Sequence, residues 1–340
     1  MIIRSKAPLR IGLAGGGTDV SPYSDLYGGA ILNATINMYA YATIEPLENG
    51  KIILEAVDRK EKCEFEMQEK LPIDGMLDLL KGVYNHIVKH FVKKPLSFKL
   101  TTHTDSPAGS GMGTSSTLVA AILGAFVEWL NLPLGEYDIA HLAYQIERVD
   151  LAMAGGKQDQ YAATFGGFNF MEFYANDKVI VNPLRIRSKY KNELSYNLLL
   201  FYTQTSRLSS TIIEAQAKNV TKKKTQSIDA MHSLKKQAVM MKEALLRGEL
   251  DKIGEILDFG WKFKKQMAKG ITTPLIDEIY ATALQHGATG GKISGAGGGG
   301  FMILYCPANT RFEVRKALEQ FGGDLKRYEF VQEGLTTWKL

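Results

Sequence analysis

Three clusters of glycine constrain this chain more than any other feature of its sequence. They lie at residues 12–17, 106–116 and 290–300 and hold many of its 33 glycines. Glycine weakens regular helices and strands, yet the second cluster runs directly into the apolar stretch 115–130 and the third into the apolar stretch 301–305. Loops placed in this way predict sites where a ligand or another part of the backbone comes close to the main chain.

The second cluster has the composition of an anion-binding loop. Its glycines allow backbone N–H groups to turn toward an anion, and the helix that follows adds the positive end of its dipole. Ser115 and Ser116 stand at the junction, where a hydroxyl caps a helix or binds Mg²⁺. The Walker order and the dinucleotide fingerprint are both absent. The structural alternative for this cluster is a plain turn with a helix cap. For the third cluster the alternative is a flexible linker.

Three acidic residues stand out by their surroundings. Asp159 lies beside Lys157 in a segment flanked by glycines. Glu147 lies on a predicted helix, and Asp19 follows three glycines. A carboxylate in such a loop accepts a proton or binds a metal, with the nearby cation tuning its charge. The structural alternatives are that Asp159 caps a short helix and that Asp19 is a turn residue. The six histidines are scattered, so no zinc site is predicted.

Composition and charge exclude several classes of protein. Hydrophobic residues make up 45% and charged residues 23% of the 340 residues, as in ordinary globular proteins. The net charge of +5 is small for this length, so no nucleic-acid partner is predicted. No signal peptide is visible, and the longest apolar runs are shorter than the ~20 residues that span a bilayer. We expect a cytoplasmic protein with no membrane segment. Its two cysteines, Cys63 and Cys306, predict no disulfide framework.

The hydrophobic pattern predicts an α+β fold in two domains. Alternating and β-branched stretches predict strands at 39–45, 52–57, 96–102, 168–173, 198–202, 301–305 and 326–331. Apolar residues at steps of three and four predict helices at 76–91, 137–149 and 228–247. The stretch 115–130 is apolar nearly all round and predicts a buried helix, and further helices are expected at 208–219, 252–269 and 312–321. The polar stretch 176–197 is the expected junction, and it divides the chain into domains 1–180 and 181–340.

Taken together, the motifs resemble those of the GHMP small-molecule kinases. They are Ala-Pro-Leu-Arg at 7–10 with Gly-Gly-Gly-Thr-Asp at 15–19, then Pro-Ala-Gly-Ser-Gly-Met-Gly-Thr-Ser-Ser at 107–116, then Lys-Ile-Ser-Gly-Ala-Gly-Gly-Gly at 292–299. They occur in the family's order at the expected separations, so the resemblance spans nearly the whole chain. It implies the two-domain GHMP kinase fold, with an ATP-binding N-terminal domain and the active site in the cleft between the domains.

The resemblance also implies roles for individual residues. Asp159 matches the family's catalytic aspartate, and Arg10 matches the basic residue beside it. Ser116 and Glu147 would hold Mg²⁺. The phosphates of ATP would lie against Pro107, Gly109, Ser110, Gly111, Met112, Gly113, Thr114, Ser115 and Ser116. The glycines of the third cluster near the site would be Gly295, Gly297 and Gly298. The substrate would be bound by Asp19, which matches the acid that binds sugar hydroxyls, and by Thr18, Lys157 and Arg207.

Within the family, the stretch 10–23 is most similar to kinases that act on a phosphorylated heptose. That resemblance implies ATP-dependent phosphorylation of the anomeric hydroxyl of D-glycero-D-manno-heptose 7-phosphate. A kinase for a neutral sugar such as L-fucose stays open, as does a catalytically silent sensor of sugar and nucleotide. The phosphate already on the sugar needs a cation, for which Arg207 is preferred and Lys157 is second. The basic run 222–224 is expected to be a solvated helix face. A homodimer is compatible with the sequence.

Overall fold

The computed structural model of the protein describes residues 1–205 and 209–340. Its larger sheet has eight strands in the order β12-β1-β2-β5-β3-β4, with β6 paired to β2 and β7 paired to β6. These strands are β1 (Ile3–Ala14), β2 (Gly29–Pro46), β3 (Lys51–Ala56), β4 (Glu61–Glu66), β5 (Phe98–Thr104), β6 (Phe168–Phe173), β7 (Val179–Pro183) and β12 (Thr336–Lys339). Because β2 is 18 residues long, it pairs with β6 along its first part and with β5 along its second.

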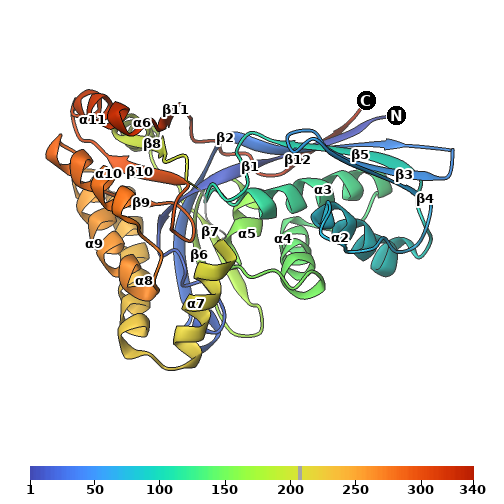
Figure 1. The fold of residues 1–340 in the computed structure, drawn as a ribbon, viewed down its shortest axis with the longest axis horizontal. Helices are drawn as coiled ribbons and strands as arrows, with labels where there is room; N and C mark the ends of the chain where they lie inside the picture. Colours follow the sequence, from blue (N-terminus) through green and yellow to red (C-terminus); the bar gives the residue numbers. More distant parts are fainter. Residues whose placement is uncertain (206–208) are drawn as a thin grey trace.

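One face of the larger sheet is covered by helices (Figure 1). They are α2 (Asp78–Ile87), α3 (Thr114–Leu130), α4 (Glu136–Gln145) and α5 (Gln158–Phe165), and the short α1 (Tyr23–Tyr27) lies between β1 and β2. α3 is apolar on nearly every side because it contacts β1 and β2 on one side and α2, α4 and α5 on the others. π-Helical turns extend α2 over Val88–Val92 and α4 over Ile146–Asp150.

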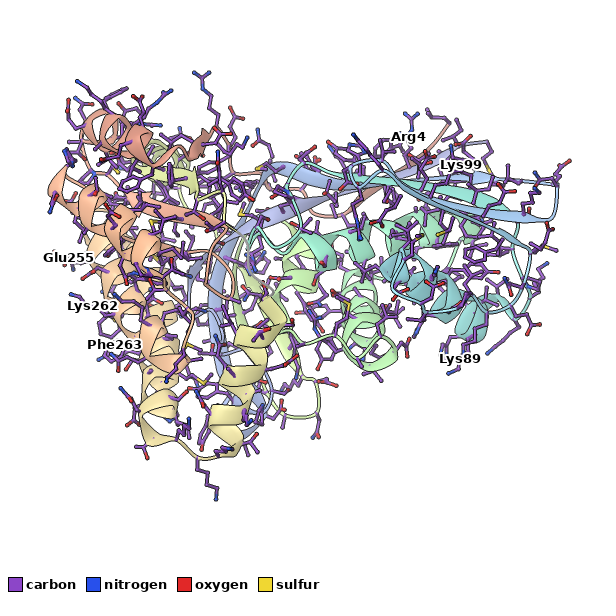
Figure 2. The ribbon with its side chains drawn as sticks, viewed as in Figure 1. Arg4, Lys89, Lys99, Glu255, Lys262 and Phe263 are labelled. Atoms are coloured by element: carbon purple, nitrogen blue, oxygen red, sulfur yellow. The ribbon has the colours of Figure 1, made fainter. Side chains whose placement is uncertain are left out.

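The second part of the chain forms a smaller sheet with helices of its own. Its strands, in the order β11-β8-β10-β9, are β8 (Leu198–Tyr202), β9 (Gly290–Ile293), β10 (Phe301–Tyr305) and β11 (Asp324–Lys326). The helices are α6 (Ser188–Asn197), α7 (Ser209–Thr221), α8 (Thr225–Arg247), α9 (Lys252–Met267), α10 (Pro274–Gln285), α11 (Arg311–Leu318) and the 3₁₀ turn Glu319–Phe321. α9 packs against α8 and β9, and Glu255 and Lys262 project from its outer face (Figure 2).

The two sheets share a hydrophobic core. Leu9 of β1 is buried in the same cluster as Leu200 of β8 and Met241 of α8. After β11 of the smaller sheet, the chain returns to the larger sheet, where the last strand, β12, pairs antiparallel with β1. The boundary expected at residue 180 falls within β7, and we keep it as a proposal for where the first unit ends.

The α+β class is confirmed, but helix α6 was not predicted and the closing strand was expected at the wrong place. The polar stretch expected to be a junction contains α6, which buries only Leu194 and Asn197 and therefore shows little apolar periodicity. The closing strand expected at 326–331 lies instead at Thr336–Lys339. The alternation at 326–331 arises because Tyr328 and Phe330 pack against the shared core outside a strand. No helix in the described part of the chain has the length and apolar character needed to cross a membrane.

Candidate active site

The centre of the candidate site is an ion pair between β1 and α5. Arg10 Nε and Nη2 lie 2.7 and 2.6 Å from the same oxygen, Oδ1, of Asp159. Arg10 is buried, and its Nη1 donates to the carbonyl oxygen of Gly111 at 2.6 Å. Asp159 keeps 22% of its side chain exposed. Its other oxygen, Oδ2, has no hydrogen-bond partner among the described residues, so it is available to accept a proton from a ligand.

The glycine loop that precedes α3 lies directly beside this pair. Gly109, Gly111 and Gly113 have φ angles of 76, 81 and 77°, in the left-handed region that favours glycine. A Cβ at Gly113 would lie 3.2 Å from Oδ2 of Asp159, so the loop and the carboxylate border the same space. The 17-residue helix α3 begins at the end of this loop. Loop and helix together favour an anion next to Asp159.

The side chains of the loop divide by burial. Pro107 is exposed, Thr114 and Ser115 are partly exposed, and Ser110 and Ser116 are buried. Met112 belongs to the hydrophobic core, so only its backbone can face a ligand. The loop therefore offers mainly main-chain N–H groups, together with the hydroxyls at the start of α3.

The third glycine cluster packs against the second. A Cβ at Gly111 would lie 2.3 Å from the carbonyl oxygen of Ser294, and a Cβ at Gly295 would lie 2.7 Å from the Cα of Gly111. The N–H of Phe301 donates to the carbonyl of Ser110 at 2.9 Å. The glycines of the second and third clusters therefore allow the two loops to pack backbone against backbone.

Gly297 and Gly298 lie farther along the third cluster. The N–H of Gly298 donates to the carbonyl of Ile271 at 2.8 Å, and a Cβ at Gly297 would lie 2.8 Å from the same oxygen. These two glycines fasten the loop to the segment after α9. Their expected place near the site stays a prediction.

Ser116 and Glu147 lie together, joined by Gln160 of α5. Gln160 Nε2 is 3.1 Å from Ser116 Oγ and 2.5 Å from Glu147 Oε2. Glu147 is fully buried, and its Oε1 has no hydrogen-bond partner, with Arg148 3.7 Å away. Burial raises the pKa of this carboxyl, and Arg148 opposes the shift.

This pair of oxygen donors fits Mg²⁺. The cation is usually bound by one or two carboxylates, with waters and substrate phosphates completing the octahedron. The described residues contain no group of three or more acidic, histidine or cysteine side chains that could hold a metal without such help. The unpartnered Oε1 of Glu147 and the hydroxyl of Ser116 are the groups that would face the ion.

Asp19 is held in place by the backbone of the segment before α5. Its Oδ2 accepts from the N–H groups of Lys157 and Gln158, at 2.9 and 3.1 Å. A Cβ at Gly156 would lie 1.9 Å from Oδ2, so the tight approach requires glycine there. Burial and the nearby charge of Asp159 raise the pKa of Asp19. The two aspartates thus border one site.

A cavity of about 220 Å³ opens beside Asp19. Its walls include Arg148 and Gly155 on one side and Ile213 and Glu214 of α7 on the other. The cavity gives Asp19 a path to ligands that the tight backbone packing around its carboxyl would otherwise deny.

Lys157 is engaged by the protein itself. Its Nζ lies 2.8 Å from Asp177 and 3.3 Å from Asp25, and 5.5 Å from the ring centre of Tyr144. Burial lowers its pKa, but the hydrogen bond to Asp177 and the negative groups around it outweigh burial, so the pKa is raised. Two carboxylates therefore already lie beside this ammonium, which also lines the 220 Å³ cavity, and the role of Lys157 in phosphate binding stays a prediction.

Thr18 also serves the fold. It is fully buried, and its hydroxyl lies 2.8 Å from the carbonyl of Gly15 and 2.9 Å from that of Ala30. Thr18 therefore connects the first glycine loop to β2, and its expected contact with the substrate stays a prediction. Arg207, the other expected phosphate ligand, lies outside the described residues.

Two buried lysines that the sequence did not single out lie beside the first glycine loop. Lys264 Nζ donates to the carbonyl of Gly16 at 2.9 Å, and Lys292 Nζ to that of Gly12 at 3.0 Å. Burial lowers the pKa of Lys264 to about 8 and that of Lys292 well below its ordinary value. Lys264 follows Gly260 by one helical turn on the buried face of α9, and a lysine on an apolar face is the signal that could have revealed it.

Relatives of known activity resemble the whole chain. Residues 78–167 match the family described as GHMP kinases N terminal domain, and residues 241–324 match GHMP kinases C terminal. The D-glycero-alpha-D-manno-heptose 7-phosphate kinase of Campylobacter jejuni is 48% identical over 338 residues, which cover 99% of each chain. The chain belongs to the GHMP kinase family. The family membership expected from the three motifs is thereby confirmed.

Further relatives of this GHMP kinase extend the likeness. The crystal structure of a D-glycero-D-manno-heptose 1-phosphate kinase from Bacteroides thetaiotaomicron has a TM-score of 0.84 at 46% identity, over 99% of each chain. The bifunctional fucokinase/GDP-fucose pyrophosphorylase of Arabidopsis thaliana is 26% identical over 95% of this chain, which corresponds to 32% of that longer protein.

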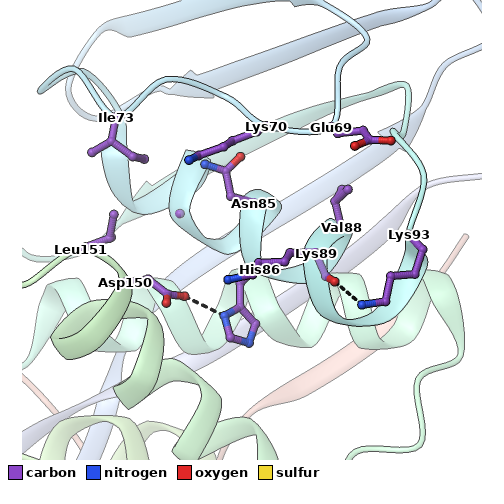
Figure 3. Close-up of a pocket in the computed structure, with 11 residues that line it drawn as sticks. Glu69, Lys70, Ile73, Asn85, His86, Val88, Lys89, Lys93, Asp150 and Leu151 are labelled. Carbon is purple, nitrogen blue, oxygen red and sulfur yellow. Dashed lines mark hydrogen bonds and ion pairs between the residues drawn. The ribbon is translucent and has the colours of Figure 1, made fainter.

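A larger cavity of this GHMP kinase, of about 630 Å³, lies beside α2 (Figure 3). Its walls include His86 and Asp150, whose side chains lie 2.7 Å apart, and Leu151. None of the residues expected at the site from the sequence lines this cavity. The candidate site is therefore the region around Arg10 and Asp159, and the volume of a cavity alone would have pointed elsewhere.

Proposed function

We propose that this chain is an ATP-dependent kinase that phosphorylates the anomeric hydroxyl of D-glycero-D-manno-heptose 7-phosphate. The product is the 1,7-bisphosphate, a precursor for nucleotide-activated heptose. The observation that carries the proposal is the 48% identity, across 99% of each chain, to a kinase named for this substrate. The Arg10–Asp159 pair beside the glycine loop supplies the chemistry that such a reaction needs.

Asp159 and Arg10 would act on the attacking hydroxyl. Oδ2 of Asp159 accepts the proton of the anomeric hydroxyl while the sugar oxygen forms a bond to the γ-phosphorus of ATP and the bond to ADP breaks. Arg10 holds Oδ1, which orients the carboxylate, and its guanidinium adds positive charge beside the transferred group. The proton leaves Asp159 for solvent after the product departs.

The loop 109–113 and the start of α3 would hold the phosphates of ATP. Backbone N–H groups and the helix dipole oppose the phosphate charge. Ser116 and Glu147 would hold Mg²⁺, which, when bound, neutralises charge on the β- and γ-phosphates. Asp19 would accept hydrogen bonds from sugar hydroxyls at the 220 Å³ cavity.

Two other functions have less support. A kinase for a neutral sugar such as L-fucose rests on the fucokinase relative, whose identity to this chain is 26%. A catalytically silent sensor would be expected to lack part of the catalytic group. Arg10, Asp159, Ser116 and Glu147 are all present and placed together in pairs, which argues for an active kinase.

A coupled ADP-release assay tests the proposal. Purified protein with ATP and Mg²⁺ is offered heptose 7-phosphate, the corresponding free heptose, D-mannose and L-fucose. We expect turnover with heptose 7-phosphate to exceed that with the free sugars, and phosphorus NMR to show a new phosphate coupled to the anomeric proton. Efficient turnover of L-fucose with none of heptose 7-phosphate would reject the proposed substrate.

A further inference from the structure

Two buried ammonium groups face one point beside the loop 12–17. A Cβ at Gly16 would lie 3.7 Å from Lys264 Nζ and 3.8 Å from Lys292 Nζ. Apart from the adjoining chain, no other heavy atom of the described residues lies within 4 Å of that position. Each ammonium has three protons and directs one to the carbonyl of Gly16 or Gly12. A group placed at this point would be contacted by both lysines.

The surrounding protein does not balance the charge at this point. Neither lysine forms an ion pair with a carboxylate of the described residues. Arg10 adds positive charge, and the acid that faces Lys264, Asp19, already accepts hydrogen bonds from backbone N–H groups. An ammonium buried without a partner is costly, and the pKa values of both lysines are lowered as a result. A buried group of cations with so little counter-charge fits an anionic ligand.

The side-chain amide of Gln216 on α7 lies beside the same loop. Gln216 is 1% exposed, and its Nε2 has no hydrogen-bond partner among residues 1–205 and 209–340. A Cβ at Gly17 would lie 3.3 Å from Oε1 of Gln216 and 3.6 Å from Lys264 Nζ, so the amide oxygen is the atom of Gln216 that borders the loop near the ammonium. A buried amide N–H without an acceptor costs free energy that a ligand oxygen would recover. The two ammonium groups therefore have further protons to donate to a ligand, and the Nε2 of the nearby Gln216 amide is a third donor.

We propose that Lys264, Lys292 and Gln216 bind the phosphate that the sugar already carries. This inference rests on the proposed function, because a phosphorylated acceptor brings an anion to this end of the site. The loop 12–17 leads into Asp19, the expected ligand of sugar hydroxyls, whereas the phosphates of ATP are assigned to 109–113. The sugar extends from Asp159 past Asp19 to the loop 12–17. Lys264 thus takes the role that the sequence suggested for Arg207 or Lys157.

Gly16 offers a second way to perturb this phosphate site. Its φ is outside the left-handed region, unlike those of Gly15 and Gly17, so alanine fits its backbone conformation. The added Cβ meets only the two ammonium groups, at ordinary contact distances of 3.7 and 3.8 Å. Gly16→Ala should therefore fold normally and place a methyl group where the phosphate would lie.

Enzyme kinetics of matched variants test the assignment. Lys264→Met and Gly16→Ala should each raise KM for heptose 7-phosphate by roughly 10- to 100-fold, because a charged partner of the phosphate is lost or blocked. KM for ATP should stay within about twofold. Lys262→Met, on the same helix but 69% exposed, is the control and should behave as the wild type. Equal rises in KM for both substrates, or an unchanged KM for the phosphorylated sugar, would overturn the proposal.

Binding of inorganic phosphate separates this inference from the proposed function. A non-hydrolysable ATP analogue at saturation first fills the loop 109–113. Phosphate should then raise the Tm of the wild type and of Lys262→Met but not that of Lys264→Met or Gly16→Ala. The same shift in all four proteins, or in none, would overturn the phosphate site. A selective shift in a protein that does not phosphorylate heptose 7-phosphate would keep the anion site and overturn its assignment to the sugar.

Discussion

Replacement of Lys264 by methionine should stabilise the free protein while it weakens binding of the phosphorylated sugar. The ammonium of Lys264 is buried on the inner face of α9 and forms one hydrogen bond, to the carbonyl of Gly16. Methionine has a similar length and no charge, so it fills the same space without the cost of burying an ion. The residue is thus expected to serve binding at the expense of stability.

The size of the effect follows from the pKa. Burial lowers the pKa of Lys264 from 10.5 to about 8, with Asp19 opposing the shift and Arg10 adding to it. At ~1.4 kcal/mol per pKa unit, the charge costs the fold about 3 kcal/mol below pH 8. Loss of the hydrogen bond to Gly16 returns about 1 kcal/mol, so the variant gains about 2 kcal/mol. With ~2.1 cal/mol/K of unfolding entropy per residue, Tm should rise by ~3 °C.

The gain should depend on pH with a definite sign. The folded pKa of Lys264 lies below the unfolded value, so between pH 8 and 10.5 the unfolded chain binds more protons than the folded chain. Raising the pH through this window therefore stabilises the wild type relative to Lys264→Met. The advantage of the variant should be largest near pH ~7 and shrink toward pH ~10.

Guanidinium unfolding at several pH values measures these differences. Lys262→Met is the control, because this exposed lysine pairs with Asp258 at the surface and its loss should change stability by less than about 0.5 kcal/mol. A variant Lys264→Met that is less stable than the wild type near pH ~7, or whose advantage grows with pH, would refute the reasoning.

Three further predictions concern the reacting centre. Asp159→Asn should lower kcat by ~10²–10⁴ at a temperature where the variant is still folded, although loss of the charge beside the buried Arg10 should also lower its Tm. Wild-type turnover in that variant would remove Asp159 from the mechanism. Glu147→Gln should raise the Mg²⁺ concentration needed for half-maximal activity by roughly 10- to 100-fold, whereas an unaltered Mg²⁺ requirement would reject Glu147 as a ligand. Gly156→Ala places a Cβ 1.9 Å from Oδ2 of Asp19, and it should raise KM for the sugar at least about tenfold but not KM for ATP. A normal sugar KM would show that Asp19 does not contact the sugar.

The parts of the fold that could be predicted are those with a clear local period. Helix α8 has apolar residues at steps of three and four, α3 is a long stretch that is apolar on nearly every side, and the structure contains both. β1 was not predicted, although it is buried along most of its length, because its near-continuous apolar run contains Pro8, Arg10 and Gly12 and lacks alternation. α6 has too few buried positions to show a helical period.

In the candidate site, too, short motifs could be predicted from the sequence, whereas contacts between residues distant in the sequence could not. The three glycine clusters and Asp159 stand in short motifs, so the sequence could locate them. The environment of Lys157 depends on Asp25 and Asp177, which lie far from it in the chain and which no local pattern connects. The proposed role of Lys264 in anion binding likewise depends on Gly16 and Lys292, which are distant in the sequence and meet Lys264 only in the folded chain.

The pairing of β12 with β1 sets the order in which the larger sheet can be completed during synthesis. Residues 336–339 pair with residues 3–6, and Ile2 and Leu340 exchange two backbone hydrogen bonds, at 3.0 and 2.9 Å. β1 leaves the ribosome before β12, so this edge of β1 lacks its β12 partner until residue 339 has been made. An unpaired strand edge is a template for pairing with other chains. A chain released after β11 would carry every residue of the candidate site and still expose that edge of β1 to its neighbours.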